Sequence, residues 1–398
     1  MKNISQKRIL VFGGSDMQLS IIKQCMDLGL YTVVIDPSPN APAKNIADAF
    51  EIVGGQDFEG TCEVVRKHKI NGILTTATDK PLVMMARIAK EFNFPFIPVE
   101  TAEITTNKYL MKQVFIKNNI PCANIRLIDK IDDTLEYPLV MKPIDNSGSR
   151  GVIFCNNKQE AEMHFSEVTQ HTKKENIAVE NIVYGQEYSL ESLHYEGKTI
   201  LYQITEKYMT PKPYFTEMEL LEPPLLSNEK VNEIRRVVEK IAEAFNFHNC
   251  GSHNEIKIDQ NGNIKVIEVS PRFAGDYITS TLVPLSTGLN VELNLIKIAL
   301  GLEPDLTMPK NIAHSGIFYF NLKPGIVKKM TDYQYIKEID GVIELKFNLE
   351  VGSIVNEIHL GPDRYGYVIL QRDSREQLLK LRDRVYEEMR KNIIIEPK

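Results

Sequence analysis

Two glutamates in the second half of the chain are spaced so that a hairpin would bring their carboxylates together. Asn261 and Gly262 are a strong signal for a β-hairpin, because both central residues of a type I′ turn need a positive φ. With a two-residue loop, Glu255 lies directly opposite Glu268 on one face of the hairpin. Like charges at that spacing repel, so a positive group must lie between them. Two carboxylates suit magnesium, which usually binds the phosphates of a nucleotide at the same time.

The residues around this pair support a buried site but leave one alternative open. The same register places His253 opposite Ser270, and apolar neighbours favour a hairpin that packs in a core. The turn after Glu268 presents Arg272, whose fork of donors suits phosphate. The alternative is an exposed carboxylate pair on a solvated hairpin, because a three-residue loop would break the pairing.

A lysine and a loop rich in glycine and serine form a second candidate site. Lys142 ends the apolar run 139–141, and residues 145–151 return the chain to a strand. Backbone amides freed by Gly148 and Gly151 could close over phosphate oxygens while Lys142 neutralises their charge. The loop is no P-loop, since G-x-x-x-x-G-K-[ST] is absent and no helix follows. An ordinary surface hairpin is equally compatible with this pattern.

Two weaker candidates complete the set. Lys108 opens a predicted helix after Asn107, where the positive end of the helix dipole favours anions, although a solvated lysine is the simpler interpretation. His248, Cys250 and His253 match no standard zinc spacing, so we expect partly buried residues near a strand. Cys250 has no evident base and is not expected to act as a nucleophile.

The elements that must position these residues follow three patterns along the chain. Residues 1–106 alternate strands and helices, which predicts an open parallel sheet. Residues 107–309 begin with a helix and continue as antiparallel strand pairs, with a mobile lobe expected at about 138–185. Residues 310–398 contain strands and a charged helix. The predicted fold class is α/β, with an N-terminal parallel sheet, a central two-lobed α+β domain and a small C-terminal α+β module.

Composition excludes several classes of protein. The 398 residues are 43% hydrophobic and 25% charged, typical of a globular chain with two or three domains. A net charge of −6 gives no global positive field for nucleic acid or an anionic membrane. The cysteines form no C-x-x-C pair, which favours reduced thiols in a cytosol. Because no long apolar stretch or secretory leader is present, we expect a cytoplasmic protein.

In their order along the chain, these pieces resemble the ATP-grasp superfamily over about residues 8–301. Residues 107–112 are similar to the family's motif that carries its first nucleotide-binding lysine, and residues 139–143 to the strand that carries the second. Residues 147–151 are similar to the glycine-rich lid over the phosphates. The resemblance implies ATP and magnesium as cofactors, with manganese as an alternative ion. The residues that it assigns to the nucleotide are Lys108, Lys142, Ser147, Gly148, Ser149, Gly151, Glu180, Asn181, Val183 and Glu187.

Three positions carry the details of the resemblance. Residues 179–183 are similar to the hinge that reads adenine, where Glu180 would accept from the exocyclic amine, and Glu187 is similar to the ribose-binding carboxylate. Glu255 and Glu268 stand at the two magnesium positions. Ser270 stands where the family commonly has asparagine; a hydroxyl is a shorter, weaker ligand, so a second metal ion stays open.

Within the superfamily the chain looks most like the branch of L-amino acid ligases and carbamoyl-phosphate-synthase-like enzymes. Such enzymes activate a carboxylate as an acyl phosphate and join it to an amine, so Arg272 and Lys142 would be catalytic. The substrate would contact Glu217, Arg272 and Asp276. A histidine that commonly follows the P-Y-F-x-E stretch in that branch is missing. The structural alternatives are that Glu217 pairs with Lys212 and that Asp276 caps the next helix.

The predicted partners are a small-molecule carboxylate and an amine, with no nucleic acid and no membrane, and a homodimer is left open. Two other functions stay open. A purine-pathway-like or carbamoyl-phosphate-synthase-like enzyme would share the nucleotide site. A non-catalytic nucleotide-binding protein is suggested only by Ser270.

Overall fold

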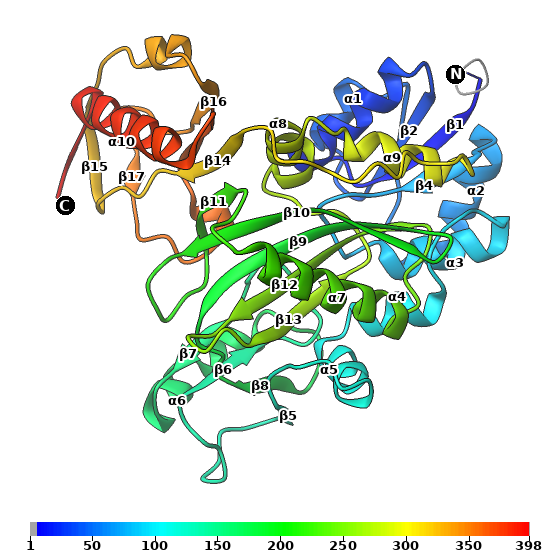
Figure 1. Ribbon diagram of the computed structural model, residues 1–398, viewed down its shortest axis with the longest axis horizontal. Helices are drawn as coiled ribbons and strands as arrows, with labels where there is room; N and C mark the ends of the chain where they lie inside the picture. The colour runs from blue at the N-terminus through cyan, green and yellow to red at the C-terminus, as the bar shows by residue number, and fades with distance from the viewer. Residues whose placement is uncertain (1–5, 398) are drawn as a thin grey trace.

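The N-terminal part of the computed structural model, which describes residues 6–397, is a four-stranded parallel sheet of order β3-β2-β1-β4 (Figure 1). The inner residues of its central strands, 9–12 and 32–35, are buried and mostly apolar, as expected for parallel strands between helices. The sheet confirms the predicted α/β unit. Its elements are β1 (Arg8–Phe12), α1 (Leu19–Asp27), β2 (Tyr31–Asp36), β3 (Ala49–Ile52), α2 (Phe58–His68), β4 (Gly72–Leu74), α3 (Leu82–Phe92) and α4 (Val99–Thr105).

A four-stranded antiparallel sheet of order β5-β8-β6-β7 forms a lobe beneath the rest of the molecule in Figure 1. The helix α5 (Lys108–Lys117) leads into it, and the side chain of Asn107 caps this helix by accepting from the amides of Tyr109 and Leu110. The lobe contains β5 (Ile125–Ile128), β6 (Leu139–Lys142), β7 (Ile153–Cys155), α6 (Lys158–Thr169) and β8 (Ile177–Asn181).

An eight-stranded antiparallel sheet runs through the centre of the molecule, in the order β13-β12-β9-β10-β11-β14-β18-β16. The helix α7 (Asn228–Ala244) packs on it through the buried side chains Ile234, Val238 and Ile241. The other central elements are β9 (Gln186–Tyr195), β10 (Lys198–Met209), β11 (Glu217–Glu222), β12 (Cys250–Ile258), β13 (Ile264–Ser270), α8 (Val283–Thr287) and α9 (Val291–Ala299).

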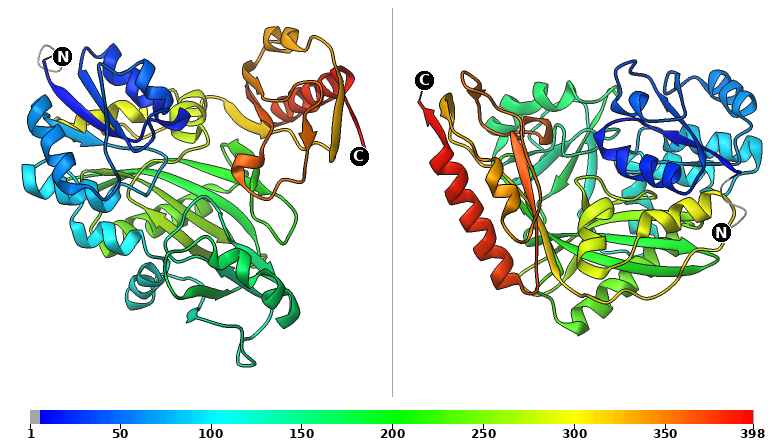
Figure 2. Two further views of the ribbon diagram at one scale, coloured as in Figure 1. Left: turned by 180° about the vertical axis from the view of Figure 1, so that it is seen from behind. Right: turned by 90° about the horizontal axis from the view of Figure 1, so that it is seen from above.

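The C-terminal module continues the same sheet and then builds its own layer. Its strands β14 (His314–Tyr319), β16 (Val342–Phe347) and β18 (Gly366–Arg372) extend the central sheet beyond β11. A second sheet contains β15 (Gly325–Met330), β17 (Ile354–Val355) and β19 (Ile393–Glu396), with α10 (Arg375–Asn392) packed beside it. Figure 2 shows this module and the N-terminal domain at opposite ends of the molecule.

The hairpin of β12 and β13 corrects the predicted turn and keeps the predicted pairing. Its loop has three residues, 260–262, closed by a 3.1 Å hydrogen bond from the Asp259 amide to the Asn263 carbonyl, so the two-residue loop was wrong. A three-residue loop shifts the pairing of the two strands by one residue and would separate the two glutamates. Ile267 is an extra residue in β13 that forms a β-bulge, and this bulge restores the predicted pairing beyond it. Glu255 therefore still lies opposite Glu268.

The N-terminal and central domains share one hydrophobic core. Ile9 and Ile22 belong to the same buried cluster as Leu295 and Ile298 of α9. Between α1 and α9, the hydroxyl of Ser20 donates to the carboxylate of Glu292 at 2.6 Å.

Among residues 6–397, the helices are all too short or too polar to cross a membrane.

Candidate active site

A cavity of about 1010 Å³ lies where the N-terminal domain, both central lobes and the C-terminal module meet. Every residue that the sequence assigned to nucleotide, metal or substrate lines this cavity, with the single exception of Gly151. These residues come from segments more than 100 positions apart, so the fold brings the separate candidates into one site.

Glu180 stands between two lysines at the end of the cavity formed by the small lobe. Lys142 Nζ lies 3.0 Å and Lys112 Nζ 3.3 Å from Glu180 Oε2. Burial alone would raise the pKa of Glu180, but the two ammonium groups lower it below its usual range. Its other oxygen, Oε1, is buried without a hydrogen-bond partner among the described residues. With two ammonium groups beside one carboxylate, this end of the cavity has a net positive charge, which favours the binding of phosphate.

Lys207 of β10 is the centre of a buried cluster of three carboxylates. Its Nζ lies 2.7 Å from Glu255 Oε1, 3.0 Å from Glu187 Oε1 and 3.2 Å from Glu217 Oε1. Burial opposes the charged form, yet the three carboxylates raise the pKa of Lys207 well above its usual value. Glu217 thus pairs with Lys207 and not with Lys212, whose Nζ lies 3.7 Å from the centroid of the Phe154 ring.

The opposed glutamates offer hard oxygen ligands to the cavity. Each is balanced by its own lysine, Glu255 by Lys207 and Glu268 by Lys108 at 2.5 Å. Lys108 is therefore a buried, paired lysine rather than a solvated one. Over residues 6–397, groups of three or more His, Cys, Asp or Glu arranged for a metal ion are absent. A two-carboxylate site of this kind is compatible with magnesium, which keeps several of its waters.

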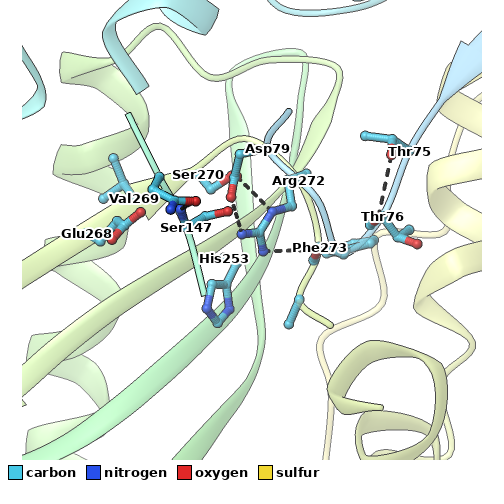
Figure 3. A network of polar contacts seen from close by, with 12 residues as sticks. Thr75, Thr76, Asp79, Ser147, His253, Glu268, Val269, Ser270, Arg272 and Phe273 are labelled. Carbon is cyan, nitrogen blue, oxygen red and sulfur yellow. Dashed lines mark hydrogen bonds and ion pairs between the residues drawn. The ribbon is translucent and has the colours of Figure 1, made fainter. Parts of the chain in front are cut away.

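Asp79 of the N-terminal domain holds both Ser270 and Arg272, as Figure 3 shows. Arg272 donates from Nε at 2.9 Å and from Nη2 at 2.8 Å to the two oxygens of Asp79. Although burial raises the pKa of Asp79, the guanidinium lowers it to about 2. The Ser270 hydroxyl donates to Asp79, which competes with the predicted role as a metal ligand.

Asp276 is bound by an arginine of the C-terminal module. Arg364 donates to the two carboxylate oxygens of Asp276 at 2.8 and 3.2 Å. The predicted helix cap is wrong, because the helical turn 278–282 begins after Tyr277 and has no side-chain cap. Asp276 and Tyr277 both have a positive φ, 48° and 61°, an uncommon conformation for residues other than glycine.

His253 forms a buried pair behind the carboxylates. Its Nδ1 lies 2.5 Å from Glu191 Oε1 and its Nε2 lies 3.5 Å from Glu255 Oε1. Burial disfavours the imidazolium, but Glu191 raises the pKa of His253 to about 9. His253 therefore carries a positive charge at neutral pH.

The predicted phosphate loop, residues 145–151, has left-handed backbone at three positions. Gly148 and Gly151 have φ values of 67° and 74°, and Ser149 between them has a φ of 55°. Arg150 Nε donates to the Ser147 carbonyl at 3.1 Å. Left-handed backbone of this kind is typical of loops whose amides bind anions, and Ser147, Gly148 and Ser149 line the cavity.

Residues 135–280 match the sequence pattern of the ATP-grasp domain, and residues 318–393 match that of L-amino acid ligase C-terminal domain 2. Residues 135–280 are therefore an ATP-grasp domain. The L-amino acid ligase of Bacillus licheniformis has the same fold as this ATP-grasp chain, with a TM-score of 0.82 and 21% identity over 98% of this chain and 99% of that one. These similarities confirm the predicted superfamily and fold class.

Curated relatives include enzymes of two kinds. The chain is 24% identical to alanine–anticapsin ligase of Bacillus amyloliquefaciens, over 60% of this chain and 56% of that protein. It is 26% identical to formate-dependent phosphoribosylglycinamide formyltransferase of Wolinella succinogenes, over 49% of this chain and 52% of that protein. The chain thus spans a little over half the length of each of these two relatives.

Five residues of this ATP-grasp site were not assigned a role from the sequence: Asp79, Lys112, Glu191, Lys207 and Arg364. A signal was present for Lys207, because the charged pair Glu206 and Lys207 interrupts a mostly apolar stretch, residues 200–209. Asp79 lies in the loop after β4, at the carboxyl end of a parallel strand, where ligands commonly bind. Nothing local marks Arg364, which depends on a partner 88 positions away.

Proposed function

We propose that this chain is an ATP-dependent ligase that activates a carboxylate and joins it to an amine, forming ADP and phosphate. The observation that supports the proposal best is the single cavity that collects the two lysines at Glu180, the opposed glutamates and Arg272. Those residues suit a reaction whose catalysis is mainly positioning and charge neutralisation.

The reaction proceeds in two displacements. A substrate carboxylate oxygen attacks the γ-phosphorus of ATP, the bond from phosphorus to the β,γ-bridging oxygen breaks, and ADP leaves. The amine then attacks the acyl carbon, a proton is lost from nitrogen, and inorganic phosphate leaves. Neither step needs a nucleophile from the protein, in keeping with the buried Cys250, whose thiol pKa is raised by burial.

Each part of the site has a role in this proposal. Lys108 and Lys142 hold phosphate oxygens, and the buried Oε1 of Glu180 accepts from the adenine amine. Magnesium, held by Glu255 and Glu268, would neutralise phosphate charge when bound. The remaining donors of Arg272, fixed in place by Asp79, face the transferring group.

We infer that at least one substrate is an amino acid. The ion pairs around Lys207 contain one more acid than base. The acids are Glu187, Glu191, Glu217 and Glu255, and the bases are Lys207, His253 and Lys257. Burial raises the pKa of Glu217, although Lys207 opposes the shift. An ammonium group would satisfy this excess of carboxylate, so we assign it to Glu217 and Asp276.

The reaction can be tested without knowing the substrate. The protein is incubated with ATP, magnesium and pooled acids and amines, phosphate release is followed, and products are identified by mass spectrometry. Phosphate release that requires amino acids supports the proposal. Release that requires a ribonucleotide amine or bicarbonate would place the chain in the purine-pathway-like or carbamoyl-phosphate-synthase-like group instead, and tight ATP binding without release would make it a nucleotide-binding protein.

The ammonium site has its own test. In Glu217→Gln and Asp276→Asn, the KM for the amino acid should rise roughly ten- to a hundred-fold, because a buried charge pair is lost, while the KM for ATP changes little. Glu233→Gln, which alters an acid on α7 outside the cavity, serves as the control. Unchanged kinetics in both cavity variants would remove these residues from the substrate site.

A further inference from the structure

A loop of the C-terminal module, residues 359–364, contacts residues 214–216, the segment that leads into β11. The ring of His359 stacks on Tyr214 with 4.0 Å between ring centroids. The Thr216 hydroxyl donates to the His359 carbonyl at 2.7 Å. The module therefore fixes the residues immediately before Glu217, although it lies more than 140 positions further along the chain.

Arg364, at the end of this loop, uses most of its N–H donors in hydrogen bonds to other residues of the protein. Besides the two hydrogen bonds to Asp276, its Nη1 donates to the Glu217 carbonyl at 3.3 Å and its Nε donates to the Gly361 carbonyl at 2.9 Å. Its guanidinium carbon lies 3.8 Å from the centroid of the Tyr319 ring. Four of about five available N–H groups are thus engaged, which leaves little capacity to bind substrate directly.

The two groups that Arg364 connects are acids that repel each other. Asp276 raises the pKa of Glu217 beyond the effect of burial, whereas Lys207 and Arg364 lower it. Asp276 also holds a left-handed φ of 48°, which a non-glycine residue adopts only when its surroundings enforce it. The bidentate bond to Arg364 is such an enforcing contact, because it is partly buried and fixes both carboxylate oxygens.

We propose that Arg364 is a positioning residue for the substrate's ammonium group, acting through Asp276 and the Glu217 segment. This inference rests on the proposed function and adds that the C-terminal module shapes the amino acid site without contacting the substrate. Loss of Arg364 should disorder both carboxylates and weaken amino acid binding, while the nucleotide end of the cavity stays intact.

Arg382 of the same module provides a matched control. It also forms an ion pair with the central sheet, at 2.9 Å from Glu219, and it lies over an aromatic ring, Phe318. Its side chain is 21% exposed, compared with 12% for Arg364, and it does not line the main cavity. A purely structural role would make Arg364 and Arg382 behave alike.

The experiment compares Arg364→Met, Arg364→Lys and Arg382→Met in the full chain. We expect the KM for the amino acid to rise roughly ten- to a hundred-fold in Arg364→Met, with the KM for ATP within about twofold. Arg364→Lys keeps the positive charge but loses the planar pair of N–H donors. Its affinity for the amino acid should therefore lie between those of Arg364→Met and the wild type. Arg382→Met should leave both KM values unchanged. Equal rises in both KM values, or the same rise in Arg382→Met, would overturn the proposal.

Two further readouts keep the inference separate from the proposed function. If Arg364→Met does not fold, Arg364→Lys carries the test, and wild-type KM values in that variant would also overturn it. If the wild-type protein releases no phosphate with any amino acid, the proposed function fails. Amide hydrogen exchange then decides about Arg364: exchange over residues 213–217 and 276–277 should become faster in the Arg364 variants and not in Arg382→Met, and unchanged exchange would reject the positioning role.

Discussion

Lys207 Nζ lies 2.7 Å from Glu255 Oε1, so a lysine of the protein already neutralises one of the two carboxylates that we assign to magnesium. The same ammonium group contacts Glu187 and Glu217. Ribose, metal and substrate positions of the proposed site therefore share one buried cation. Binding of a metal ion at Glu255 would change the balance of charge at the other two carboxylates.

Replacing Lys207 by Met should destabilise the protein strongly. Three buried carboxylates would lose their common partner, and breaking a buried ion pair costs roughly 3–5 kcal/mol. Urea unfolding measures the change, with Lys67→Met as a control, because that exposed pair with Glu51 is worth about 1 kcal/mol or less. Magnesium should recover part of the loss in Lys207→Met. Equal stabilities of the two variants would contradict the central role of Lys207.

Replacing Glu268 by Gln should remove turnover and leave the fold intact. Loss of one charged oxygen ligand should slow phosphate release by at least about a hundred-fold. Because Glu268 is partly exposed to the cavity, the midpoint of thermal unfolding should change little. Phosphate release and thermal unfolding of the purified variant check both statements. Normal release would exclude Glu268 from the metal site.

The phosphate loop, residues 145–151, should become protected when nucleotide binds. Hydrogen exchange in this loop is expected to slow in the presence of a non-hydrolysable ATP analogue and magnesium, since closure excludes water from a reactive acyl phosphate. The hairpin turn Glu196–Gly197, which does not line the cavity, should exchange at the same rate with and without the analogue. Identical exchange in the loop under both conditions would rule out a lid.

Gly151→Ala should weaken ATP binding although Gly151 does not line the cavity. Its φ is +74°, and an added Cβ would come within 2.9 Å of the His171 ring. The matched control is Gly197→Ala, which has a φ of +75° and nothing within 4 Å of the added atom. Both variants carry the backbone strain, roughly 1 kcal/mol or more, so only the first should raise the KM for ATP. The same KM in both would show that the crowding at His171 has no effect.

The stability of the protein should fall as the pH rises from 5 to 8, in part because of Glu292. This residue is buried between α1 and α9, and burial raises its pKa from 4.5 to about 7. The folded state therefore binds the proton more tightly than the unfolded state, so the stabilisation is complete below about pH 4.5 and is lost as the pH rises through 7. The expected loss between pH 5 and 8 is on the order of 2 kcal/mol.

Urea unfolding of the wild-type protein and of Glu292→Gln at pH 5, 6.5 and 8 checks this, since the amide cannot ionise. The variant should show a smaller pH dependence, but a slope of the same sign should remain, because burial raises the pKa of Glu222 to about 8. A pH dependence as steep as that of the wild type would show that Glu292 is not responsible.

The opposed glutamates show what local sequence can predict. The Asn261-Gly262 signal correctly located a hairpin, and hydrophobic patterning correctly placed it in a core. The loop length was wrong, and the bulge at Ile267 compensated for the error. The residues of β13, Ile264–Ser270, carry no distinct signature of a bulge at Ile267, so the pairing was predicted by an argument that was only partly right.

The unpredicted parts of the site depend on contacts distant in sequence. Asp79 and Arg272 are 193 positions apart, and Asp276 and Arg364 are 88 apart. A charged side chain alone does not reveal which partner it will meet after folding. For this reason the sequence located Glu217 and Asp276 in the site but gave each of them a wrong alternative partner, Lys212 for the first and a helix end for the second.

The continuity of the central sheet into β14 limits how the gene can be divided. The predicted border near residue 310 separates β11 from the strand that covers its outer edge by antiparallel pairing over residues 219–222. A fragment ending there would present a row of open backbone donors and acceptors beside the buried side chains Leu220 and Leu221. Such a fragment is expected to self-associate into insoluble material, so shortened versions for crystallisation or enzyme engineering should keep β14 and β18 together with the ATP-grasp region.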